Sequence, residues 1–347
     1  MPSDTALAAS APITAGASTA TPVLRVSGLS VEYRTSRGVV HALDDVSFDL
    51  APGETLGIVG ESGCGKSTLA RAVVRLLDPS AGTIRLGDTD ITHASRRRMR
   101  AARRDLQMVL QDPAASLDPR WTVGDLLAEP LEIHGIGTRA ERRARVADLL
   151  RKVGLPPEAA QRRPHEFSGG QRQRVGIARA LALEPKVVVL DEPVSALDVS
   201  VQAQILNLLT DLQRTLGVSF LFIGHDLSVV EHVSDRVAVM YLGRIVELGG
   251  RDSLWRRPAH PYTRALLDAA PRIDGPSAPS GPGLIGDTPS PYDLPSGCRF
   301  HTRCPIAADR CRREAPVTRA LSPGHLVACH FAEGGAEASP LQPAGST

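Results

Sequence analysis

The sequence is poor in aromatic residues and carries almost no excess of charge. Phe, Trp and Tyr together make up 3% of the 347 residues, which argues against a broad surface for stacking single-stranded bases. Forty Lys and Arg against 38 Asp and Glu leave a net charge of +2, so no global attraction to nucleic acid is expected. We therefore expect no nucleic-acid partner.

Long apolar runs are also missing. None approaches the roughly 20 residues that a membrane-spanning helix needs. The start, MPSDTALAASAPITAGASTATP, lacks the basic and leucine-rich stretches of a secretory signal. We expect an intracellular protein that reaches any membrane through a partner.

Changes in composition divide the chain into zones. Residues 1–21 and 333–347 lack periodicity and are predicted to be disordered tails. Residues 22–262 alternate strand and helix patterns with short turns, which is typical of an α/β domain. Residues 263–332 form a C-terminal extension, in which residues 274–297 are rich in Pro, Gly and Ser and predict a linker or an extended arm.

The segment ETLGIVGESGCGKSTLARAVVRLL contains a phosphate-loop motif between a strand pattern and a helix pattern. Its glycines let backbone N–H groups turn toward the β-phosphate, and the helix N-terminus adds its positive end. Lys66 would place a charge between the β- and γ-phosphates, and the Ser67 hydroxyl would ligate Mg²⁺. The predicted nucleotide contacts of this segment are Gly60, Glu61, Ser62, Gly63, Cys64, Gly65, Lys66, Ser67 and Thr68.

A second motif lies in KVVVLDEP, where an apolar run ends in an acidic pair. Such a run between prolines is typical of a central parallel strand buried on both faces, and ligands of α/β sheets bind at the carboxyl ends of such strands. We predict that Asp191 holds Mg²⁺ through water and that Glu192 polarises the attacking water. No internal repeat duplicates the motifs, so one nucleotide unit per chain is expected.

The stretch EFSGGQRQRVGIARAL adds a second anion site at a helix start, with Ser168 as a plausible N-cap. One domain rarely needs two cradles for a γ-phosphate. Two copies facing head to tail would use both, because each would supply its Ser168, Gly169, Gly170 and Gln171 to ATP on the other.

With these residues the sequence resembles the ATP-binding-cassette ATPases over about residues 22–262. FSGGQ looks like their signature motif, with Phe167 in place of the more usual Leu. By this resemblance Gln111 senses Mg²⁺ and the γ-phosphate, His225 is the switch histidine, and Tyr33 stacks on adenine. Asp198, in SALD, resembles the loop that crosses the dimer. The implied fold is an α/β P-loop NTPase core with a RecA-like parallel sheet, an antiparallel β subdomain and an α-helical subdomain at about residues 113–178.

Several further stretches, including HPYTRALL, resemble the ATPases of oligopeptide and dipeptide importers, in particular the second of the two ATPase types of one transporter. The resemblance implies a peripheral subunit on the cytoplasmic side of the membrane that uses ATP and Mg²⁺. Its partners would be two membrane permeases, a second ATPase subunit of the same or a related chain, and indirectly an extracytoplasmic substrate-binding protein. Nickel or another small solute is an alternative cargo. A soluble ATPase outside transport, or a metal or redox sensor built on the C-terminal module, are the rival classes.

Cysteine is scarce, and four of the five cysteines lie near the end of the chain. Cys298, Cys304, Cys311 and Cys329 are separated by five, six and seventeen residues. Disulfides are not expected in an intracellular chain, so the cluster suggests a metal site. The gaps suit a 4Fe–4S cluster better than the short pairs of zinc ribbons, and the resemblance to peptide-importer tails implies the same cluster. Zinc, or unligated cysteines that pack a small subdomain, stay open.

Two features have plain interpretations. Cys64 is read as a small loop residue, with a redox-sensitive thiol as the alternative. The arginine-rich run at residues 96–104 predicts a solvated or subunit-facing helix rather than a nucleic-acid patch.

Overall fold

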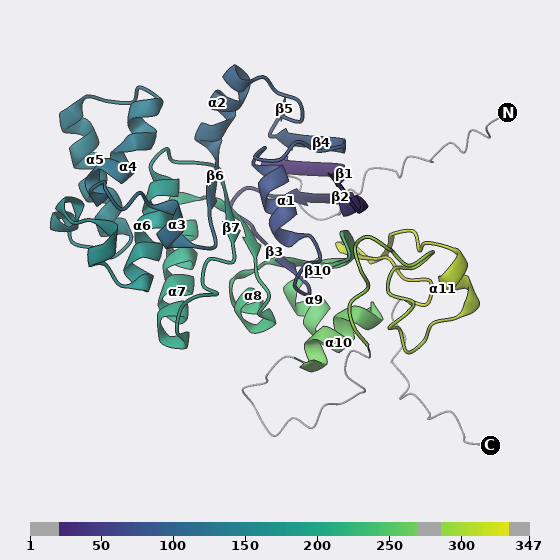
Figure 1. Ribbon diagram of the computed structural model, residues 1–347. Coiled ribbons are helices and arrows are strands. Elements are labelled where there is room, and N and C mark those ends of the chain that lie inside the picture. The colour runs from purple at the N-terminus through teal and green to yellow at the C-terminus, as the bar shows by residue number, and fades with distance from the viewer. Residues whose placement is uncertain (1–20, 270–285, 333–347) are drawn as a thin grey trace.

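The structure is a computed structural model that describes residues 21–269 and 286–332 (Figure 1). The predicted tails at 1–21 and 333–347 lie outside the described residues, except for residue 21. So does the part of the predicted linker before residue 286.

An eight-stranded sheet forms the centre of the molecule, in the order β11-β12-β10-β9-β3-β8-β7-β6. The pairs from β6 to β9 are parallel, and the pairs of β10 with β9 and with β12 are antiparallel. Every residue of β3, β7 and β8 is buried, as expected for parallel strands covered on both faces. The strands are β3 (Thr55–Val59), β6 (Leu106–Val109), β7 (Val187–Asp191), β8 (Ser219–Ile223), β9 (Arg236–Tyr241), β10 (Arg244–Gly250), β11 (Arg319–Ser322) and β12 (His325–Val327).

Alternate residues of these strands pack into two separate hydrophobic clusters, one on each face of the sheet. In β7, Val188 and Leu190 join one hydrophobic cluster, whereas Val187 and Val189 join the other. The side-chain period of two explains the division, because successive side chains point to opposite faces. The helices are α1 (Lys66–Val73), α2 (Arg96–Asp105), α7 (Val199–Leu216), α8 (Leu227–Val233), α9 (Arg251–Arg256), α10 (Pro261–Ala269) and α11 (Asp309–Arg313).

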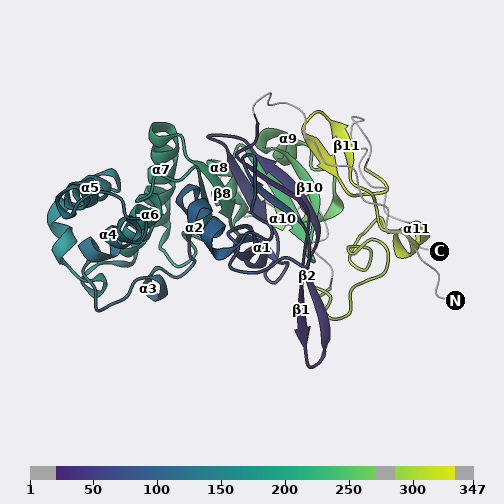
Figure 2. The same cartoon turned by 90° about the horizontal axis from the view of Figure 1, so that it is seen from above.

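A second, antiparallel sheet of order β2-β1-β4-β5 packs with α1 on one core. Its strands are β1 (Leu24–Thr35), β2 (Gly38–Leu50), β4 (Ala81–Leu86) and β5 (Thr89–Asp90). Seen from above, the β1–β2 hairpin projects beyond the rest of the molecule (Figure 2). With the parallel sheet, this arrangement confirms the predicted α/β P-loop core with an antiparallel β subdomain.

A group of helices lies at the opposite end of the molecule from the C-terminal residues (Figures 1 and 2). It comprises α3 (Pro113–Ser116), α4 (Val123–Ile133), α5 (Arg139–Lys152), the short 3₁₀ turns η1 (Pro157–Gln161) and η2 (Pro164–Glu166), and α6 (Gly169–Leu181). Thr138 and Ser168 begin α5 and α6 with capping boxes. The helical group begins at Pro113, but its last helix ends at Leu181, beyond the predicted end at about residue 178, and the domain boundaries themselves stay predictions. The arginine-rich run forms α2, in which only Met99 is buried.

The C-terminal extension is joined to the central sheet. Strand β12 pairs with β10, so that Glu247 lies opposite Val327. The Glu247 carboxylate is buried and accepts hydrogen bonds from the backbone N–H groups of Ala259 and His260 at 2.8 and 2.9 Å, with His325 Nε2 at 2.8 Å. Burial alone would raise the pKa of Glu247, but these hydrogen bonds outweigh it and lower the pKa. The sequence predicted an extension and did not predict that it shares the sheet.

Within the described residues, no helix combines the length and the apolar character needed to cross a membrane.

Candidate nucleotide site

A cavity of about 740 Å³ opens where the strands β3, β7 and β8 end. Its walls come from the phosphate loop, from the hairpin strands β1 and β2, and from the segments after β6, β7 and β8. The carboxyl ends of parallel strands are where α/β sheets bind ligands. Residues predicted from separate stretches therefore meet at one place.

Glycine is required at two positions of the phosphate loop. Gly60 has φ 154° and Gly65 has φ 109°, values that favour glycine. A Cβ at Gly60 would collide with the carbonyl oxygen of Met240, and one at Gly65 would lie 2.5 Å from the carbonyl oxygen of Ala42. The loop therefore passes too close to β2 and β9 for any larger residue.

Lys66 is a buried cation within this loop. Its side chain is 5% exposed, and Nζ donates to the carbonyl oxygens of Gly60 at 2.8 Å and Glu61 at 3.0 Å. Among the residues that the structure describes, no carboxylate forms an ion pair with Lys66. A buried charge without a direct counter-ion suits an anionic ligand, so the loop fits a phosphate group.

Ser67 and Asp191, two of the three predicted magnesium ligands, lie in contact with each other. The Ser67 hydroxyl donates to Asp191 Oδ1 at 3.0 Å, although the residues are far apart in the sequence. Burial raises the pKa of Asp191, the Ser67 hydrogen bond opposes this, and the neighbouring Glu192 adds to the rise. A hydroxyl beside a buried carboxylate is a set of oxygen donors that Mg²⁺ prefers.

Glu192 is the meeting point of the three predicted catalytic residues. Gln111 Nε2 donates to Glu192 Oε2 at 3.0 Å, and His225 Nδ1 lies 3.2 Å from the same oxygen. All three line the cavity. Glu192 also has a positive φ of 47°, which is unusual for a residue with a side chain and is typical of functional sites. The geometry suits a base that acts on water held beside a phosphate.

The remaining cavity walls include residues that the sequence analysis missed. Tyr33, 37% exposed, lines the cavity as predicted, and its stacking on adenine stays a prediction. Leu266, Pro291 and Leu294 of the C-terminal extension also line it. The sequence analysis had marked the motif HPY, whose Pro261 and Tyr262 begin α10, and the segment at residues 274–297, but neither pattern pointed to the nucleotide.

Cys64 is part of the loop but not of the cavity wall. Its side chain is 2% exposed, and burial raises the pKa of its thiol. A buried thiol with a raised pKa is a poor nucleophile, so the geometry favours a small loop residue over a redox-sensitive one.

The signature residues lie outside the cavity. The Ser168 hydroxyl accepts from the Gln171 N–H at 3.3 Å, and the Gln171 side-chain oxygen accepts from the Ser168 N–H at 3.1 Å. Gly170 packs against Val201, which lies three residues after Asp198. Asp198 caps α7 by accepting a hydrogen bond from the Val201 N–H at 3.0 Å. The signature segment and the segment of Asp198 are therefore neighbours, and the structure places neither of them at the chain's own phosphate loop.

The four clustered cysteines lie near one another. Burial, together with the nearby Cys298, Cys329 and Cys311, raises the pKa of Cys304 to about 11. The Cys298 N–H donates to the carbonyl oxygen of Cys311 at 2.8 Å. Within the described ranges, however, no group of three or more His, Cys, Asp or Glu residues is placed to hold a metal ion. The geometry gives the predicted 4Fe–4S cluster no support, because spacing along the chain does not fix where thiols point.

Comparisons with known proteins agree with this site. The family model described as ABC transporter matches residues 43–195, and the model of the oligopeptide/dipeptide transporter C-terminal region matches residues 246–311. A putative peptide import ATP-binding protein of Brucella ovis is 55% identical over 90% of this chain and 98% of its own length. The di/tripeptide transport ATP-binding protein DppF of Pseudomonas aeruginosa is 51% identical over 90% and 98%. The oligopeptide transport ATP-binding protein AppF of Bacillus subtilis is 52% identical over 86% and 92%.

Solved structures show the same cassette. The ATP-binding cassette MJ0796, in a dimeric post-hydrolysis state with ADP and Pi, is 28% identical, with a TM-score of 0.61 over 66% of this chain and 98% of that one. CbiO1 of Clostridium perfringens, part of the transporter complex cbiONQ, is 32% identical, with a TM-score of 0.61 over 68% and 92%. With the phosphate loop, the acidic pair and these relatives in agreement, the chain belongs to the ABC transporter family and is one of its ATPases.

Proposed function

We propose that this ATPase powers the import of di- and oligopeptides. The observation that carries the proposal is the presence, in one chain, of the ABC transporter ATPase region and of the C-terminal region typical of oligopeptide and dipeptide transporters. Relatives named for peptide, dipeptide and tripeptide transport share both over nearly their whole length. No observation favours nickel, another solute or a function outside transport.

The proposed chemistry is phosphoryl transfer to water, in which positioning and charge neutralisation do most of the work. Lys66 would hold the phosphates, and Ser67, Asp191 and Gln111 would hold Mg²⁺. Glu192 would take the proton of the attacking water, and His225, 3.2 Å from Glu192, would contact the γ-phosphate.

A second ATPase subunit completes each site. ABC ATPases act as dimers, and the signature residues of this chain lie outside its own cavity. Ser168, Gly169, Gly170 and Gln171 would therefore serve ATP on the partner, with Asp198 at the contact. A related chain is our preferred partner, because the sequence resembles one of two ATPase types in a single transporter.

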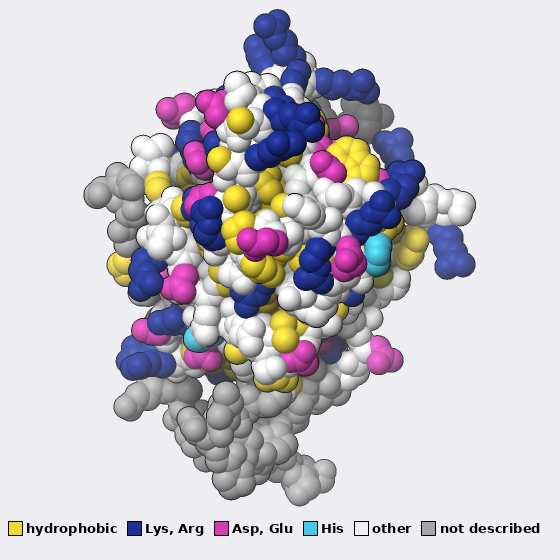
Figure 3. All heavy atoms as spheres, turned by 90° about the vertical axis from the view of Figure 1, so that its left-hand side faces the viewer, with side chains coloured by type: hydrophobic (Ala, Val, Ile, Leu, Met, Phe, Trp, Pro, Cys, Tyr) yellow, Lys and Arg dark blue, Asp and Glu magenta, His cyan; other side chains and the backbone are white. Residues whose placement is uncertain are grey.

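Membrane permeases are the other proposed partners, and a groove suits them. A cavity of about 430 Å³ lies between β6 and the helices α4 and α6, with more apolar than polar residues in its wall. Leu76 and Ile133 are 57% and 53% exposed beside it. Hydrophobic side chains reach the surface in the middle of the helical face, with Lys and Arg around them (Figure 3).

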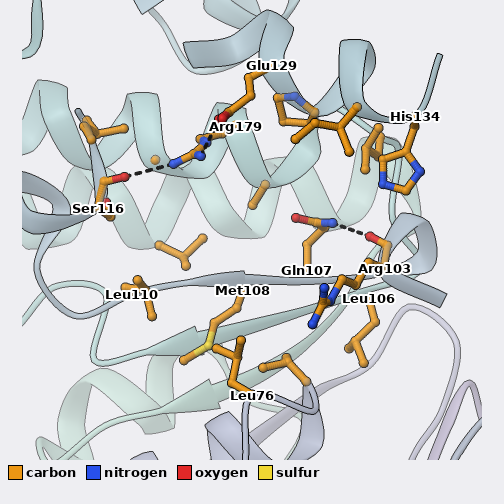
Figure 4. Close-up of a pocket in the computed structure, with 18 of the residues that line it drawn as sticks. Leu76, Arg103, Leu106, Gln107, Met108, Leu110, Ser116, Glu129, His134 and Arg179 are labelled. Atoms are coloured by element: carbon orange, nitrogen blue, oxygen red, sulfur yellow. Dashed lines mark hydrogen bonds and ion pairs between the residues drawn. The ribbon is translucent and has the colours of Figure 1, made fainter. Parts of the chain in front are cut away.

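Polar contacts of Arg179 connect the helices on one side of the groove. Arg179 donates to the Ser116 carbonyl oxygen at 2.9 Å and pairs with Glu129 at 2.6 Å, which ties α6 to α3 and α4 (Figure 4). Met108 and Leu110, on the strand and segment that lead to Gln111, lie on the opposite side (Figure 4). A short permease helix seated here would sit directly beside the residue that contacts Glu192. Its position would place the chain on the cytoplasmic side of the membrane.

The test is transport. We expect the chain, co-expressed with two peptide-importer permeases and supplied with a peptide-binding protein, to hydrolyse ATP faster in proteoliposomes when a tripeptide is added with the binding protein. Nickel and sugars serve as alternative solutes. Stimulation by one of these and not by peptides would overturn the peptide assignment, and activity indifferent to the permeases would point to a function outside transport.

The 4Fe–4S cluster is kept as a separate proposal. Its support is the spacing of Cys298, Cys304, Cys311 and Cys329 along the chain and the resemblance of this segment to the tails of peptide-importer ATPases. Binding would require the four thiols to close on the metal, because no three are placed to ligate one ion in the structure. Anaerobically purified protein should then contain iron and absorb broadly near ~400 nm. The variant Cys64→Ser is the matched control, since it removes the one cysteine outside the group. Iron-free protein under strictly anaerobic handling would refute the cluster.

A further inference from the structure

Glu61, inside the phosphate loop, contacts Tyr262 and two residues of the C-terminal extension, Thr288 and Arg303. Its carboxylate accepts two hydrogen bonds from the Arg303 guanidinium, at 2.7 and 3.0 Å, and one from the Thr288 hydroxyl at 2.9 Å. Its backbone N–H donates to the Tyr262 hydroxyl at 2.9 Å. Three residues far downstream thus fix both the side chain and the main chain of one loop residue.

The Arg303 end of this contact is rigid. Its side chain is 5% exposed, and the guanidinium lies 5.9 Å from the centre of the Tyr241 ring. Tyr241, Tyr262 and Phe300 pack on one another with ring centres 4.7 to 5.4 Å apart. An arginine that packs against these rings and donates two hydrogen bonds orients the Glu61 carboxylate more strictly than a single flexible contact would.

The Glu61 end touches the catalytic lysine. Lys66 Nζ donates to the Glu61 carbonyl oxygen at 3.0 Å and to that of Gly60 at 2.8 Å. A rotation of the peptide unit at Glu61 would therefore move the group that orients Lys66. The ion pair between Arg303 and Glu61 is largely buried, so the attraction between the two charges is less screened by water than in an exposed pair.

We propose that Arg303 is a positioning residue for ATP binding: through Glu61 it holds the phosphate loop in the shape that receives the nucleotide. Tyr262 and Thr288 complete the contact. The C-terminal extension is then a structural part of the ATP site, and nucleotide affinity depends on it. The inference rests on the ATPase activity alone and not on which solute is carried.

Arg303→Gln should weaken the binding of mant-ATP to the full-length chain roughly tenfold. This factor corresponds to the free energy that a hydrogen bond to a charged group typically contributes. The KM for ATP should rise by a similar factor, while kcat changes much less, because Glu192, Gln111 and His225 are untouched. Arg303→Lys should restore part of the affinity.

Arg319→Gln is the matched control. Arg319 is another arginine of the extension, in β11, and its guanidinium donates to the Ala332 carbonyl oxygen, outside the nucleotide cavity. It should lower the melting temperature as Arg303→Gln does and leave the affinity for mant-ATP unchanged. Equal affinity losses in the two variants would mean that Arg303 acts only through stability, and the proposal would fail.

Glu61→Gln repeats the test from the loop side, without disturbing the packing of the extension. It should weaken mant-ATP binding by a similar factor, and the double variant Glu61→Gln/Arg303→Gln should lose no more than the worse single variant. Additive losses would show that the two residues act independently. Unchanged affinity in Glu61→Gln would overturn the proposal even if Arg303→Gln did not fold.

Discussion

Replacing Glu192 by Gln should slow ATP hydrolysis at least a hundredfold and leave ATP binding intact. The amide keeps the shape of the side chain and its contacts with Gln111 and His225 but cannot take a proton from water, and general-base catalysis typically contributes 10²- to 10⁴-fold. The protein, with its partner subunit, should accumulate as an ATP-bound closed dimer. Phosphate release and size-exclusion chromatography with ATP measure the two effects.

Two further variants sharpen this experiment. Glu231→Gln, on α8 and outside the cavity, should behave as the unmodified protein. Ser168→Arg added to Glu192→Gln should abolish the dimer while each monomer still binds ATP, because the signature residues serve the opposite nucleotide. Unchanged turnover in Glu192→Gln would remove Glu192 as the base, and a monomer that loses ATP with Ser168→Arg would argue for a self-contained site.

Lys66→Ala should remove nucleotide binding, with a loss of affinity on the order of a hundredfold or more. Lys66 is buried, and its ammonium group already points at the loop carbonyls of Gly60 and Glu61, so no other cation can replace it at the phosphates. Titration with mant-ATP measures the loss, and hydrolysis should fall in parallel.

Lys152→Ala is the control for charge and length. Lys152 ends α5 and pairs with Asp148 on the surface at 2.9 Å, so its removal should change affinity little. A Lys66→Ala protein that binds mant-ATP normally would refute the phosphate-loop assignment outright.

Sequence motifs predicted those parts of the site whose residues are close together in the chain. The phosphate loop is one continuous stretch, and the Ser168 cap with Gln171 three residues later is a local pattern with a known helical outcome. The meeting of Gln111, Glu192 and His225 followed only from the resemblance to a family. Without it, the acidic pair alone would have marked Glu192, and nothing would have linked Gln111 and His225 to it.

Contacts between distant segments were beyond the sequence. Arg303 and Glu61 are 242 residues apart, and neither hydrophobic periodicity nor turn chemistry signals an ion pair over such a distance. The pairing of β12 with β10 was missed for a related reason, since a three-residue strand carries almost no pattern. The cysteine cluster shows the reverse case, in which suggestive spacing did not become a ligating geometry.

The sheet position of β12 also has a consequence for synthesis on the ribosome. Strand β10 is finished at Gly250, but the strand that covers its edge ends only at Val327. Chains emerge at about 5–20 residues per second, so for several seconds the nascent cassette presents an open strand edge and the Glu247 carboxylate without His325. The sheet is therefore complete only after β12 has been synthesised, and termination of the chain between these strands would leave a product prone to pair its edge with another chain.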